Sequence, residues 1–124
     1  MRINIKATSL ELTTAISNYA EKKVSALEKF INKNDESAVA NVEVGKSTKH
    51  HHSGDIFRAE INLHIAGKDL RAVAEKDNLY SAIDEVKDEM VREITSHKAR
   101  QRTLLRRGGA KIKDFIRGFY RENF

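Results

Sequence analysis

The stretch DNLYSAIDEVKDEMVREITSHKARQRTLLRR, residues 77–107, decides which fold this sequence adopts. Its apolar residues recur at intervals of three and four, the spacing of one buried stripe on an α-helix. They are Leu79, Ala82, Ile83, Val86, Met90 and Ile94. Asp77 stands at the expected N-cap, because its carboxylate can accept hydrogen bonds from unpaired N–H groups of the first turn. Acids fill the first two-thirds of the stretch and bases follow from Lys98 onward, so one end should pack and the other should meet negative charge.

The rest of the chain predicts four strands and one more helix. Alternating apolar and polar residues place the strands at 1–7, 38–45, 56–65 and 70–75. A stripe that begins at an N-cap, Thr13, and runs to about Ile31 predicts the other helix, and Gly67 predicts a tight hairpin turn. The strand at 56–65 is plainly two-faced, so helices should cover only one face of the sheet. The predicted fold is an α+β two-layer sandwich of order β-α-β-β-β-α, similar to double-stranded-RNA-binding domains.

Composition and charge narrow the class of protein. The chain has 124 residues and no cysteine, and it shows neither a membrane-spanning run nor a signal-peptide pattern. We therefore expect one cytoplasmic domain without disulfides or membrane contact. Residues 98–124 carry nine Lys/Arg against two acids, a local charge of +7, while the rest stands at −2. A basic end favours a polyanionic partner, and a solvated tail that aids solubility is the alternative.

Two glycines suggest a boundary near the end of the chain. Gly108 and Gly109 should interrupt the long helix, which divides the chain into a domain at 1–107 and a basic, aromatic tail at 108–124. The tail can pack back on the domain, contact a protein or RNA partner, or lie on a membrane surface. The sequence leaves these alternatives open.

Signs of catalysis are few. The sequence contains neither a P-loop nor a GxGxxG pattern, and no serine stands in a nucleophile-elbow context. The run His50–His52 could bind a metal weakly, but a solvated polar loop accounts for it better, because metal sites draw ligands from spaced, supported positions. We predict no enzyme activity, no cofactor, no metal site and no small-molecule substrate.

The basic residues of the two helices form the candidate RNA-binding site. They are Lys22, Lys23, Lys29, Arg92, His97, Lys98, Arg100, Arg102, Arg106 and Arg107. At 100° per residue, the basic residues from Arg92 to Arg107 fall in one wide band along the helix. Long cations on a rigid rod suit phosphate contacts, and His97 could add partial charge or stack on a base. The lysines of the first helix extend this band if the two helices lie side by side.

The segment GKDLRAVAEKDNLYSAIDEVKDEMVREITSHKAR, residues 67–100, resembles the signature of the ribosome hibernation-promoting factors, also called the ribosome-associated inhibitor or Y-protein family. The specific part is the pattern Asp77, Leu79, Tyr80, Ala82, Ile83 and Asp84, followed by His97, Lys98 and Arg100. Pieces of the first helix, LTTAI at 12–16 and LEKF at 27–30, are similar too. The likeness covers about residues 1–102 and suggests a short member of the family.

The resemblance implies a function and a partner. Members dock in the decoding channel of the small ribosomal subunit, where mRNA and tRNA would lie, and hold the ribosome idle in starvation or stationary phase. Their helix cations contact rRNA, which carries over here to Lys22 or Lys23, Lys29, Arg92, Lys98 and Arg100, with Tyr80 as a packing residue. Glu89 and Ser96 depart from the family pattern, because family members often carry basic residues at those positions.

Two functions follow from the sequence. The first is a stress-response translation inhibitor that binds the small subunit and its rRNA. The alternative is a general structured-RNA-binding module or RNA chaperone that uses the same cations without ribosome preference. Whether the protein pairs ribosomes into dimers stays open.

Overall fold

The computed structural model describes residues 1–47 and 54–108. In chain order the elements are β1 (Arg2–Thr8), α1 (Thr14–Ser25), the 3₁₀ helix η1 (Ala26–Phe30), β2 (Val39–Ser47), β3 (Ile56–Ile65), β4 (Lys68–Lys76) and α2 (Leu79–Gly108). The order β-α-β-β-β-α predicted from the sequence is confirmed. The helix expected to run to about Ile31 differs in its last turn, which is 3₁₀ rather than α-helical. Of the tail predicted at 108–124, Gly108 is the last residue of α2, and residues 109–124 lie outside the described residues, as does the histidine run at 50–52.

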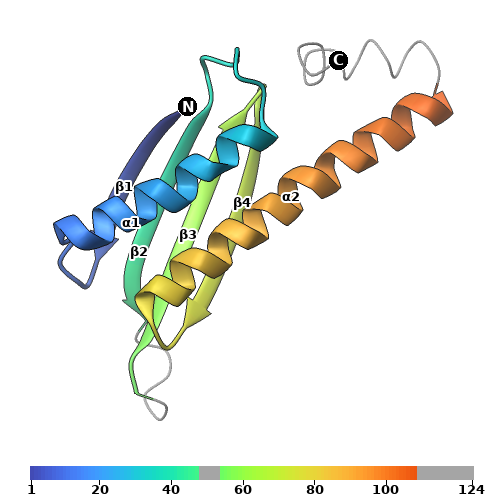
Figure 1. The fold of residues 1–124 in the computed structure, drawn as a ribbon. Coiled ribbons are helices and arrows are strands. Elements are labelled where there is room, and N and C mark those ends of the chain that lie inside the picture. Colours follow the sequence, from blue (N-terminus) through green and yellow to red (C-terminus); the bar gives the residue numbers. More distant parts are fainter. Residues whose placement is uncertain (48–53, 109–124) are drawn as a thin grey trace.

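The four strands form one mixed sheet in the order β1-β2-β3-β4. β1 pairs with β2 in parallel, and the other two pairs are antiparallel. The register aligns Ile5, Val42, Ile61 and Ala72 across all four strands, so one row of apolar side chains shares one face. Both helices cover that face (Figure 1), which confirms the two-layer α+β sandwich.

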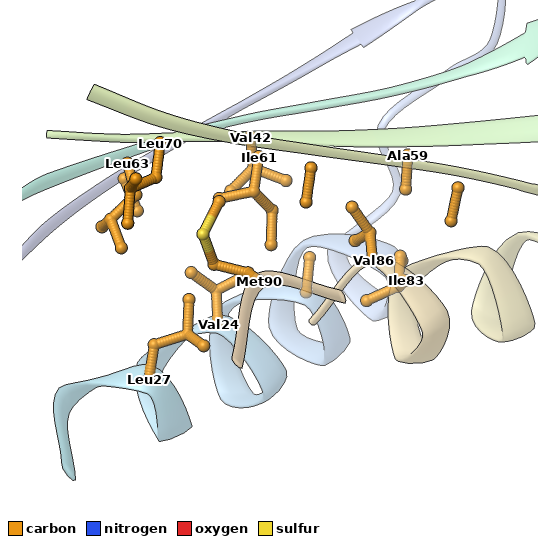
Figure 2. Close-up of a cluster of buried hydrophobic side chains, with 14 of the residues drawn as sticks. Val24, Leu27, Val42, Ala59, Ile61, Leu63, Leu70, Ile83, Val86 and Met90 are labelled. Carbon is orange, nitrogen blue, oxygen red and sulfur yellow. The ribbon is translucent and has the colours of Figure 1, made fainter. Parts of the chain in front are cut away.

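The core lies between this face and the two helices. Figure 2 shows Met90 and Val24 pointing from the helices toward Ile61 and Val42 of the sheet. All four side chains are at most 2% exposed. The complete stripe predicted on the second helix, from Leu79 to Ile94, is buried. Each large side chain removed from water in this way contributes about 1.5–3 kcal/mol.

Turns and caps fix the register of these elements. Ala66 and Gly67 both have positive φ, 47° and 76°, as a two-residue type I′ hairpin requires. The Thr13 hydroxyl accepts from Ile16 N–H at 3.2 Å, which confirms that N-cap. The N-cap predicted at Asp77 is wrong. Asn78 caps α2, because its side-chain oxygen accepts from Tyr80 and Ser81 N–H at 2.8 and 3.2 Å.

Candidate nucleic-acid interface

The C-terminal part of α2 is less buried than the rest of the helix and carries cations. The fully buried stripe ends at Ile94, and Figure 1 shows α2 continuing past the end of the sheet. Beyond Ile94, Gln101 is 9% exposed and Leu104 is 46% exposed. The exposed cations of this segment are Arg100, Arg102, Arg106 and Arg107. Within residues 1–47 and 54–108, no ion pair joins any of these four to a carboxylate.

These cations lie on two flanks of the helix rather than in the one wide band predicted from the sequence. At 100° per residue, Arg102 and Arg106 differ by about 40°, whereas Arg100 lies about 160° around the axis from Arg102. Arg107 falls on the same flank as Arg100. The projecting end therefore presents positive charge on two sides, which suits a partner that surrounds it with phosphates.

The middle of the predicted site is electrically compensated. Arg92 pairs with Glu85 at 3.3 Å and with Glu89 at 2.5 Å. The hydrogen bond that Arg92 donates to Glu89 raises the pKa of the Arg92 guanidinium, against the opposing effect of desolvation. Arg92 is 58% exposed, but its charge is already shared with two carboxylates. The departure at Glu89 noted in the sequence thus has a local consequence: it neutralises the cation one turn away.

A carboxylate of α2 also compensates Lys23 of α1. Its ammonium lies 3.4 Å from Asp84 of α2, and Tyr19 OH donates to the same carboxylate at 2.6 Å. The hydrogen bond to Asp84 raises the pKa of Lys23. The rings of Tyr19 and Tyr80 also pack edge to face, with 4.9 Å between their centres, and Tyr80 remains 40% exposed. Tyr80 therefore packs between the helices as expected, although at their surface rather than in the core.

The remaining lysines of the first helix stay at the surface. Lys22 and Lys29 are exposed, and the Lys29 ammonium lies 5.3 Å from the centre of the Phe30 ring. The two helices do lie side by side on one face of the sheet (Figure 1), as the extended band of cations requires. Lys22 and Lys29 can therefore add charge beside α2.

Lys98 and His97 are half-buried where α2 leaves the sheet. The Lys98 ammonium donates to the backbone carbonyl of Phe30 at 2.6 Å, and burial lowers its pKa. Burial, followed by the charges of Arg100 and Lys68, lowers the pKa of His97, so its imidazole is neutral at pH 7. Lys68 was absent from the predicted site. The β3–β4 hairpin brings it near His97, a proximity that residue spacing within α2 cannot reveal.

Gln101 is a buried polar residue of α2, and Leu105, one turn later, is still partly buried against the core. The Gln101 amide nitrogen lies 3.3 Å from the Nε2 atom of His97. Its side-chain oxygen is buried, and no donor in the described part of the chain reaches it. Because Gln101 and His97 both belong to α2, their contact does not tie the helix to another element.

The open face of the sheet differs from the helix end, because a carboxylate compensates the two arginines at its centre. Glu60 accepts from Arg58 at 2.7 Å, from Asn62 at 2.7 Å and from Arg71 at 3.2 Å. Hydrogen bonds from Arg71, then Asn62 and Arg58, lower the pKa of Glu60 to about 2, against the opposing effect of burial. A shallow depression of about 370 Å³ on this face is lined by amides, by carboxylates and by Lys6, whose ammonium lies 3.6 Å from Glu43. This face offers a polyanion little net attraction.

Two further findings concern membranes and metals. None of the helices in the described ranges has the length and apolar character needed to cross a bilayer. Among residues 1–47 and 54–108, no three His, Cys, Asp or Glu side chains are placed to share a metal ion.

The fold and the site define a class of protein: an α+β two-layer domain whose second helix projects a basic end that no carboxylate of residues 1–47 and 54–108 pairs with. Comparison with known proteins defines the family. Residues 3–102 match the family model described as Sigma 54 modulation protein / S30EA ribosomal protein. The chain belongs to this family of ribosome-associated proteins, which confirms the resemblance seen in the sequence.

Relatives and solved structures agree with this assignment. The chain is 30% identical over 102 residues to a ribosome hibernation promoting factor of Azotobacter vinelandii, covering 82% of this chain and 86% of that one. It is 32% identical over 98 residues to one of Klebsiella oxytoca, covering 79% and 94%. The Thermus thermophilus Protein Y N-terminal domain superposes with a TM-score of 0.64 at 30% identity, covering 78% of this chain and 99% of that domain.

Proposed function

We propose that this protein binds the small ribosomal subunit in the decoding channel, where mRNA and tRNA would lie, and keeps ribosomes inactive under stress or in stationary phase. It does so in the cytoplasm, by occupying the channel rather than by catalysis. The names of its relatives, ribosome hibernation promoting factors, support the ribosome as the partner.

The observation that carries the proposal is the exposed basic end of α2, whose arginines form no ion pair within the part of the chain that the structure describes. A rod of positive charge that is exposed on two flanks suits a corridor walled by rRNA phosphates. Such contacts are insensitive to sequence and sensitive to salt. We assign the direct contacts to the exposed cations Lys22, Lys29, Arg100, Arg102, Arg106 and Arg107. Lys23 and Arg92 contribute less, because carboxylates of α2 already compensate them.

The test compares two double variants with the same change of charge. Arg102→Glu with Arg106→Glu reverses the helix end, and Arg2→Glu with Lys6→Glu reverses two exposed cations of β1 on the open face of the sheet. We expect the wild type and the β1 variant to sediment with small subunits and to inhibit in-vitro protein synthesis. The α2 variant should do neither. Equal behaviour of the two variants would refute the assignment of the site.

A competition experiment separates the ribosome from RNA in general. Purified small subunits and bulk duplex RNA compete for the labelled wild-type protein at the same nucleotide concentration. Preference for the subunit supports a hibernation factor. Equal affinity would replace it with the general structured-RNA-binding module or RNA chaperone, which uses the same cations.

A further inference from the structure

Lys98 differs from the other bases of α2 in what its ammonium group contacts. It donates to the Phe30 carbonyl at 2.6 Å, a main-chain acceptor 68 residues away in sequence. Phe30 is the last residue of η1, where the final carbonyls of a helix lack intrahelical partners and carry partial negative charge. A cation is the natural group to satisfy such a carbonyl.

The place of this contact along α2 gives it mechanical importance. Ile94 is the last fully buried residue of the apolar stripe, and Lys98 follows one turn later. Beyond Lys98, the inner side of α2 is covered only by the buried Gln101 and the partly buried Leu105. From Lys98 to Gly108 the helix extends about 15 Å at 1.5 Å per residue. A tilt of about 15° at Lys98 would therefore move the tip by about 4 Å, more than the length of a hydrogen bond to a phosphate.

We propose that Lys98 is a positioning residue, which ties α2 to η1 and sets the direction in which the exposed arginines project. It holds the rod and does not itself bind phosphate. This inference rests on the proposed function for its consequence in RNA binding, but the tie between α2 and η1 can be tested in the free protein.

The experiment uses the full chain and three variants: Lys98→Gln, Lys98→Arg and Arg102→Gln. Binding to small ribosomal subunits is measured at several salt concentrations, and amide hydrogen exchange is measured in the free protein. For Lys98→Gln we expect weaker binding by three-fold or more, an unchanged slope of log K against log salt, and faster exchange along residues 95–108. Lys98→Arg should restore both affinity and protection, because a guanidinium can donate to the same carbonyl.

Arg102→Gln is the matched control for a phosphate contact. It should make the salt slope shallower by about 0.7–0.9 and leave amide exchange as in the wild type. If Lys98→Gln makes the slope shallower to the same degree with exchange unchanged, Lys98 is a phosphate ligand and the inference is overturned. If Lys98→Gln binds subunits and exchanges its amide hydrogens like the wild type, the inference is overturned as well.

The design separates this inference from the proposed function. If Arg102→Gln binds subunits like the wild type at every salt concentration, the proposed RNA contacts of the helix end are wrong. The exchange data on Lys98→Gln and Lys98→Arg still decide whether Lys98 anchors α2.

Discussion

Replacing Glu60 by Gln tests whether the ionic network on the open face of the sheet stabilises the fold. The Glu60 side chain is only 14% exposed and accepts hydrogen bonds from Arg58, Asn62 and Arg71. The substitution keeps the shape of the side chain and removes its charge. It also leaves the two arginines of β3 and β4 facing each other without the carboxylate between them.

The magnitude follows from the pKa of this carboxyl group. A fall from 4.5 to about 2 on folding corresponds to about 3 kcal/mol of stability at neutral pH. Arg71 is 61% exposed, so water screens part of its attraction, and we expect about 1–2 kcal/mol. Because the folded pKa lies below the unfolded one, this stability is fully present above pH 4.5 and is lost as the pH falls toward 2.

Urea unfolding of the wild type and Glu60→Gln at pH 7 and at pH 2 measures this contribution. The variant should be less stable at pH 7, and the difference should shrink at pH 2. Glu75→Gln is the control, because Glu75 is an exposed carboxylate of β4 without an ion pair in the described residues. A difference between wild type and Glu60→Gln that is zero at pH 7, or constant down to pH 2, would refute the reasoning.

Three further predictions concern α2. Asn78→Ala should lower the free energy of unfolding by about 1 kcal/mol, because two first-turn N–H groups lose their acceptor. Asp77→Ala should change it by less than about 0.5 kcal/mol. If urea unfolding shows the larger loss for Asp77→Ala, Asp77 is the N-cap after all. Met90→Ala should cost about 2–5 kcal/mol, since it opens a cavity between helix and sheet, and thermal unfolding that shows no loss would contradict the packing in Figure 2. Arg92→Gln should leave the slope of log K against log salt for subunit binding nearly unchanged, whereas Arg106→Gln should make it shallower by about 0.7–0.9. Equal slopes for the two variants would show that Glu85 and Glu89 do not compensate Arg92.

The fold could be predicted because its signals are local and periodic. The alternation in β3 and the three-and-four spacing of α2 each require one face to be buried, and a sheet with one apolar face leaves one side for both helices. The prediction of the N-cap of α2 was wrong because the local sequence offers two candidates. Asp77 and Asn78 are both good N-cap residues, and only the path of the chain out of β4 decides which one meets the first-turn N–H groups.

The candidate site could be predicted only in part, because charge along the sequence does not show which charges meet in space. Composition located the basic end of α2 correctly, since no acid follows Glu93 before the helix ends. The pairing of Lys23 with Asp84 and the contact of Lys98 with Phe30 join residues 61 and 68 positions apart. Such contacts depend on the side-by-side packing of the helices, which no spacing within one helix encodes.

The distribution of acids along α2 gives the helix its polarity as a binding element. Where α2 packs on the sheet, its outward carboxylates neutralise nearby cations, as Glu89 does for Arg92 and Asp84 for Lys23. Where it leaves the sheet, acids are absent, so the positive potential is concentrated at the projecting end. A uniformly basic helix would bind RNA along its whole length and in many orientations. Compensation of the packed part favours approach by the tip, which is the orientation that the proposed binding in the decoding channel requires.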